Sequence, residues 1–95
     1  MFRFADALAR AGTALGLPED QAMRLAIATL AGSAAMAAGA QESPAALADR
    51  VASPGGSTRK GLDVLDRDDA LVRLLSDTLA AATRRNAEMA AEARR

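Results

Sequence analysis

The sequence predicts an all-α protein, and three observations lead to that prediction. No stretch of the 95 residues alternates apolar and polar side chains in the way that half-buried strands do. Apolar residues recur instead at spacings of three and four, which places them on one side of a helix. Glycine and proline interrupt this pattern at points that suit helix ends. We expect one small helical domain over residues 1–95.

The composition predicts a small core. Hydrophobic residues make up 51% of the chain, but many are alanines, which bury little area, and the only aromatic residues are Phe2 and Phe4. A single domain of this size buries little more than about 60% of its unfolded surface. Such a chain gains stability by packing its helices closely or by burying a face against a second copy, so we expect a homodimer or a higher oligomer.

The first helix is expected from Phe2 to Leu15. Its apolar side carries Phe4, Leu8 and Leu15, and no capping residue precedes it. Gly16 suits the left-handed position that ends a helix, and the proline two residues later blocks continuation.

The second helix is expected from about Glu19 to Ala38, with acidic residues at its positive end. The segment Leu25–Ala40 has no charged residue, but it is shorter than the roughly 20 residues of a membrane span. Its small residues lie three or four positions apart, a spacing that permits close helix contact. They are Ala22, Ala26, Ala31, Gly32, Ala35 and Gly39. We therefore interpret the segment as a helix of a soluble protein that is buried on all sides.

Three shorter signals define the second half of the chain. Ser43-Pro44 predicts a capped helix start, with a short helix to about Val51. Ser53-Pro54 has the same form and predicts a helix that continues through Leu62 and Leu65. Asp66 or Asp68 is expected to cap the last helix, which runs on through Met89. Its apolar stripe consists of Leu71, Leu74, Leu75, Leu79 and Ala82.

The composition also excludes several kinds of site. The chain has no cysteine and no histidine, so it has no disulfide, no thiolate metal site and no imidazole base. Twelve basic residues balance twelve acidic ones, and we expect no nucleic-acid partner. The C-terminal arginines 84, 85, 94 and 95 alternate with Glu88 and Glu92, which favours a solvated helix face.

Ser53-Pro54-Gly55-Gly56-Ser57-Thr58 is the most unusual segment of the chain. Each glycine weakens a helix by about 1 kcal/mol relative to alanine, so a bare backbone has a use here. The first amides of a helix have no internal partner, and together with the helix dipole they attract phosphates and carboxylates. The segment is therefore either an anion site with two hydroxyls beside it or a plain helix start whose glycines permit tight packing.

Four stretches, in order, resemble the C-terminal domain of the pyrroline-5-carboxylate reductase family. Asp6 to Gly12, with Gly16-Leu17, resembles its "EALADAG…GL" helix. Ala22 to Met36 is similar to its "A…LA…T..GAA.M" helix. Ser43 to Val51 resembles "hPaeLrd.V", and Ala52 to Thr58 resembles the signature "TSPGGTT". The match covers the whole chain.

This resemblance implies a helical domain that intertwines with a second subunit and builds the active site at the dimer interface. The amides around Gly56 and Ser57 would receive the substrate carboxylate, within a substrate-binding set of Ser53, Gly55, Gly56, Ser57, Thr58 and, more weakly supported, Glu42. Thr58, the one residue with an implied catalytic role, would hydrogen-bond near the imine nitrogen of pyrroline-5-carboxylate. The full-length enzyme would be a cytoplasmic oxidoreductase of amino-acid biosynthesis. It would form proline and would use NADPH as the reductant.

The chain also departs from the family pattern. It has no Gly-x-Gly-x-x-Gly fingerprint after a strand, so we expect an excised or truncated domain without the Rossmann domain, without a cofactor of its own and without activity by itself. Arg59 stands where the family usually has an apolar residue.

Two other interpretations remain open at the level of the sequence. The same helices could form a stand-alone dimerisation module that has the fold and no chemistry. A membrane-associated hairpin built on Leu25–Ala40 is a third, more distant hypothesis, since we expect no membrane partner.

Overall fold

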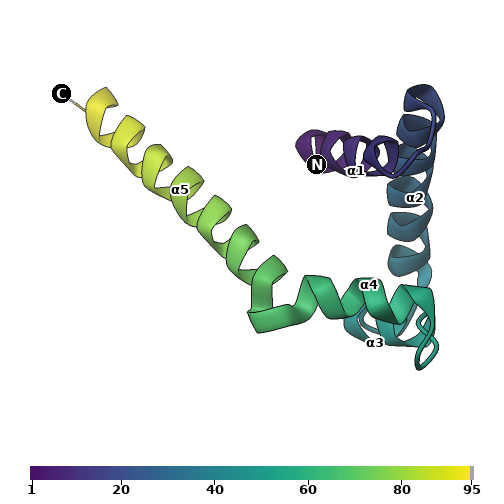
Figure 1. Cartoon of the computed structure of the whole chain (residues 1–95). Coiled ribbons are helices and arrows are strands. Elements are labelled where there is room, and N and C mark those ends of the chain that lie inside the picture. Colours follow the sequence, from purple (N-terminus) through teal and green to yellow (C-terminus); the bar gives the residue numbers. More distant parts are fainter. Residues whose placement is uncertain (95) are drawn as a thin grey trace. The chain divides into compact units, whose positions relative to one another are not determined.

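The computed structural model describes residues 1–94, and these contain helices and no strand, as the sequence predicts. The helices are α1 (Phe2–Ala14), α2 (Glu19–Gly39), α3 (Pro44–Arg50), α4 (Ser57–Asp66) and α5 (Ala70–Ala93), with a 3-10 turn at Arg67–Asp69. They group into two compact units, Met1–Ala48 and Asp49–Arg95 (Figure 1).

In the first unit α1 packs against α2 (Figure 1). Small side chains make this contact. The contact buries Ala9 of α1 against Ala22 and Ala26 of α2, with Met23 partly buried beside them. Larger apolar residues stay outside this contact, since Phe4 and Leu8 are each 42% exposed. Alanines at the contact let the two helices approach closely, but they bury little area.

The predicted end of α1 is confirmed. The Gly16 amide donates to the Thr13 carbonyl at 3.0 Å, and the Leu17 amide donates to the Gly12 carbonyl at 3.1 Å. These two bonds form the Schellman motif, which needs positive φ at its penultimate residue. Gly16 has φ +112°, so glycine is placed where its backbone freedom is required.

The expectation that α2 is buried on all sides is wrong for this chain. Ala22 and Ala26 are its only buried residues, while Leu25, Ile27 and Met36 are about half exposed. One neighbouring helix covers one stripe of a helix and leaves the rest bare. By length and composition α2 could also cross a membrane, with a mean hydropathy of 1.3. The core helix of a soluble assembly passes the same test.

The total exposed area shows that the chain lacks a full core. It exposes 7819 Å². Two separate compact units of half this length would expose roughly 6,200 Å² together. Among residues 1–94 the buried hydrophobic residues are four alanines, Ala9, Ala22, Ala26 and Ala52. Much apolar surface is therefore left for another surface to cover.

Of the three helix starts predicted in the second half of the chain, one is confirmed and two are wrong. Ser43 caps α3 as predicted, since its Oγ accepts from the Ala46 amide at 3.1 Å. Ser53-Pro54 does not open α4, which begins at Ser57. Neither Asp66 nor Asp68 caps α5, because Asp69 occupies the cap position and makes no side-chain bond there.

The connection from α4 to α5 explains the second correction. The chain turns sharply at this point (Figure 1), with Asp68 at φ +53° and Asp69 at φ +56°. A capping residue normally has an extended backbone that directs its side chain toward the first amides. The left-handed backbone of Asp69 departs from that geometry.

We expect Asp68→Gly to stabilise this unit. Glycine adopts positive φ without the steric cost of an L side chain. This cost is smaller for aspartate than for most residues, so the net gain over the entropic cost of glycine is up to about 0.5 kcal/mol. The midpoint of urea unfolding should rise. The matched control is Asp66→Gly, since Asp66 has φ −91° and ends a regular helix, so that change should lower the midpoint. If both variants lower the midpoint equally, the turn is not strained.

Candidate functional site

The residues before α4 form a tight turn. The Gly56 amide donates to the Ser53 carbonyl at 3.0 Å, and Gly55 has φ +73°. Proline in the second position and positive φ in the third are the marks of a type II β-turn. Pro54 and Gly55 are therefore turn residues, which is the physical reason that the helix starts later than Ser53-Pro54 predicts.

Gly56 is held close to the start of the turn. A Cβ at this position would lie 3.3 Å from the Ser53 carbonyl oxygen, a tight contact with rigid backbone. Gly56 also ends the turn in an extended conformation, with φ −79° and ψ 169°, and so serves as the N-cap residue of α4. The two glycines thus have different uses, positive φ at Gly55 and close approach at Gly56.

This geometry narrows the set of amides that a ligand could use. The Gly56 amide is already bonded within the turn, and the Lys60 amide begins the helical bonding by donating to the Gly56 carbonyl at 3.1 Å. The amides of Ser57 and Thr58 are the first two of the three that α4 leaves without intrahelical partners, and they point out of the helix N-terminus. No side chain caps them among the described residues. Both residues are exposed, so a small anion could reach the amides and the two hydroxyls together.

Arg59 has partners near this turn that the sequence pattern does not indicate. Its guanidinium donates from Nη1 and Nη2 to Oδ1 of Asp49, each at 3.2 Å, and from Nη2 to the Ala52 carbonyl at 3.5 Å. The signal available in the sequence was a charged residue at an apolar position of the family pattern, ten positions after an acidic residue.

The predicted site residues fall into two groups. Ser53, Gly55, Gly56, Ser57 and Thr58 lie within one turn and the first residues of α4. Glu42 precedes α3 and belongs to the other compact unit, so its part in the site stays a prediction.

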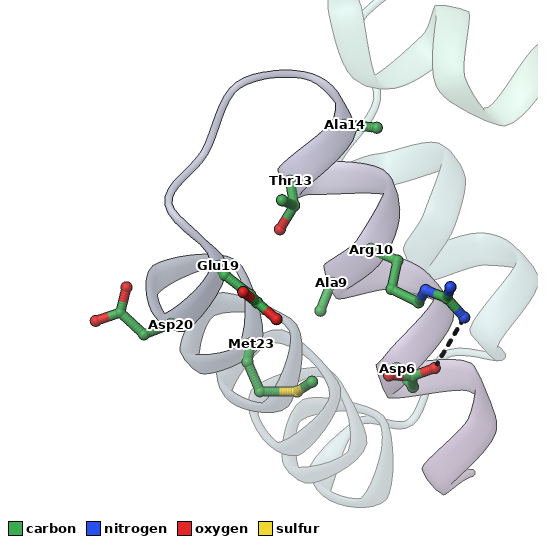
Figure 2. Close-up of a pocket in the computed structure, with 8 residues that line it drawn as sticks. All are labelled: Asp6, Ala9, Arg10, Thr13, Ala14, Glu19, Asp20 and Met23. Carbon is green, nitrogen blue, oxygen red and sulfur yellow. Dashed lines mark ion pairs between the residues drawn. The ribbon is translucent and has the colours of Figure 1, made fainter.

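A separate hollow lies between α1 and α2 and has a volume of about 920 Å³ (Figure 2). Its lining combines alanine, threonine and methionine with charged residues, and Arg10 pairs with Asp6 one turn away on the same helix, α1, at 3.8 Å. It contains none of the predicted site residues. Residues 1–94 contain no acidic cluster that could hold a metal ion. The hollow is a groove between helices rather than a site with evident chemistry.

The C-terminal face of α5 agrees with its predicted solvation. Arg85 pairs with Glu88 at 3.2 Å and with Glu92 at 3.4 Å, and these side chains are more than half exposed. Arg95 lies outside the described residues.

Comparison with known proteins identifies this arrangement. The family model described as "Pyrroline-5-carboxylate reductase dimerisation" matches residues 1–89. The chain is 42% identical over 79 residues to a pyrroline-5-carboxylate reductase of Pisum sativum, covering 83% of this chain and 29% of that protein. It is 41% identical over 85 residues to the Thermus thermophilus protein of the same name, covering 90% of this chain and 31% of that protein.

A solved structure agrees with these relatives. The crystal structure of Plasmodium falciparum pyrroline carboxylate reductase with NADP bound superposes with a TM-score of 0.78 at 28% identity, covering 87% of this chain and 32% of that one. The chain therefore spans about 30% of the length of the relatives that it matches.

Proposed function

Because the chain belongs to the family of pyrroline-5-carboxylate reductase dimerisation domains, we propose that it is the dimerisation and substrate-binding part of such an enzyme. The full enzyme would reduce 1-pyrroline-5-carboxylate to L-proline with NAD(P)H. A cytoplasmic location belongs to the same proposal and rests on the resemblance alone.

The observation that supports the binding role is the start of α4. Within the type II turn Ser53–Gly56 the Gly56 amide is hydrogen-bonded to Ser53. The amides of Ser57 and Thr58, at the helix N-terminus, have no intrahelical partner. In the proposed complex these two amides hold the substrate carboxylate. Hydrogen bonds to a charged group contribute about 1.5–3 kcal/mol each, and the helix dipole adds up to about 1 kcal/mol. The Thr58 hydroxyl would then hydrogen-bond at the ring, near the imine nitrogen.

The described part of this chain lacks the usual structural features of a dinucleotide site. The described residues form no strand and thus no fold with a glycine-rich phosphate loop between strand and helix. NADP is bound in the Plasmodium falciparum relative, and we propose that in the full enzyme a different part of the protein holds it. The part played by this chain is limited to binding and orienting the substrate.

The exposed apolar surface supports the assembly role. Large side chains on α5 stay exposed, among them Leu74 at 63% and Leu79 at 67%, and most of α2 is bare. A second copy of the chain would cover both surfaces. In this proposal no membrane and no nucleic acid takes part.

We expect L-proline, the product, to shift the amide resonances of Ser57 and Thr58 in the 95-residue chain. Prolinamide should leave them in place at the same concentration, because it has the same ring without the carboxylate. Amide chemical shifts in a ligand titration are the measurement. Equal shifts with both ligands, or none with proline at tens of millimolar, would favour the stand-alone dimerisation module.

A further inference from the structure

Arg59 connects three parts of the chain around the turn. It lies in the first turn of α4, and its guanidinium reaches Asp49 at the end of α3 and Ala52 at the start of the connecting loop. The side chain of Arg59 therefore links the beginning of α4 to the end of α3 and the start of the loop, beside the candidate anion site at Ser57 and Thr58.

The position of Arg59 differs from that of the other ion-paired arginines. Its side chain is only 29% exposed, whereas Arg10 is 78% exposed and Arg85 is 57% exposed. Both terminal nitrogens of its guanidinium bond one carboxylate oxygen, and one of them also bonds a backbone carbonyl. A planar guanidinium with several fixed donors defines geometry in a way that a lysine amine cannot.

The loop has few other anchors. Ser53, Pro54 and Gly55 are exposed, and among residues 49–94 Ala52 is the buried one, at 4% exposure. Two backbone bonds close the loop, from the Ala52 amide to the Asp49 carbonyl at 3.3 Å and from the Gly56 amide to the Ser53 carbonyl. A loop with so little buried surface opens readily unless a side chain restrains it.

We propose that Arg59 is a positioning residue, which ties α4 to the end of α3 and so fixes the orientation of the Ser57 and Thr58 amides. It contacts no ligand in this arrangement. The effect on carboxylate binding rests on the proposed function, whereas the effect on the turn itself does not.

The direct test is hydrogen exchange of the Gly56 amide, which closes the turn. In Arg59→Ala this amide should exchange at least about threefold faster, the factor expected for loss of a partly exposed ion pair and a carbonyl bond. Amides in the middle of α5 should keep their rates, which separates local opening of the turn from global unfolding. Arg85→Ala is the matched control, since it removes an ion pair of similar length on α5 and should leave Gly56 unchanged.

A double-mutant cycle shows whether Arg59 acts through Asp49. Asp49→Ala should also speed exchange at Gly56, and the double variant should be little faster than Arg59→Ala alone. Arg59→Lys keeps the positive charge but lacks the planar guanidinium with its several donors. The exchange rate of its Gly56 amide should therefore fall between those of the wild type and Arg59→Ala. Unchanged Gly56 exchange in Arg59→Ala, or fully additive effects in the double variant, would overturn the proposal.

Proline binding, measured separately, distinguishes the two proposals. If proline fails to shift Ser57 and Thr58 in the wild type while Arg59→Ala still opens the turn, the binding proposal is wrong and the positioning role is supported. If proline binds the wild type and Arg59→Ala leaves Gly56 exchange unchanged, the binding proposal is supported and the positioning role is wrong.

Discussion

Gly55→Ala is expected to weaken proline binding about tenfold or more. Gly55 has φ +73°, where an L side chain costs about 1–2 kcal/mol, and 1.4 kcal/mol corresponds to a factor of ten in affinity. Alanine either keeps the type II turn under strain or moves to negative φ and breaks the bond from the Gly56 amide to Ser53. Relief of the strain favours the broken turn, in which the amides of Ser57 and Thr58 lose their preferred orientation, so that proline binding has to restore the type II turn. Calorimetric titration with proline and a thermal melt measure the two effects.

Two controls separate backbone geometry from simple loss of a glycine. Gly61 lies within α4, and a Cβ there meets nothing within 4 Å. Gly61→Ala should therefore raise helix stability by up to about 1 kcal/mol and leave proline affinity unchanged. D-alanine at position 55, introduced by chemical synthesis, prefers positive φ and should restore binding. Full affinity in Gly55→Ala would show that the turn does not organise the site.

Gly32→Leu is expected to dissociate the proposed dimer. A Cβ on Gly32 meets nothing within 4 Å, so the single chain accommodates the larger side chain. In a dimer that uses the small residues of α2 for close packing, an added side chain costs about 1–3 kcal/mol at each copy. A symmetric interface contains the substituted residue twice, so the free-energy cost is doubled. The dimer dissociation constant should therefore rise at least about 30-fold.

Sedimentation without detergent measures this effect and tests the membrane hypothesis at the same time. Gly32→Ala should have a smaller effect than Gly32→Leu, because the loss follows side-chain size. Ala81→Leu is the matched control, since Ala81 lies one turn before Arg85 on the solvated face of α5 and should leave the dimer intact. A Gly32→Leu dimer of wild-type affinity contradicts close packing, and a wild-type chain that stays in solution only with detergent favours the membrane hairpin.

The corrected helix starts show where a local signal is ambiguous. Serine followed by proline opens a helix at Ser43-Pro44, but at Ser53-Pro54 the same pair begins a type II turn. Proline at negative φ suits both structures, and the residue after it decides between them. Ala45 follows the first proline and continues the helix. Gly55 follows the second proline, adopts positive φ and forms a turn. The glycine pair was noticed in the sequence, but its two separate uses were not.

The residues of the turn and the first residues of α4 stood out in the sequence as either an anion site or a plain helix start, and the family resemblance implied their role in binding the substrate. That role stays a prediction. The engaged Gly56 amide and the link from Arg59 to Asp49 were missed. Both depend on how a loop of several residues folds back on itself, and sequence spacing does not give that information.

The sequence by itself determined the helical class, most helix boundaries, the ends of α1 and the start of α3, since these follow from interactions within four residues along the chain. The family also follows from the sequence, from four ordered stretches. Only the tertiary structure decided which faces are covered. Periodicity gives the side of a helix that is apolar, but burial depends on the neighbour that covers it. In this chain α1 covers one narrow stripe of α2 at Ala22 and Ala26, and the remaining apolar surface is exposed, where we propose that a second copy packs.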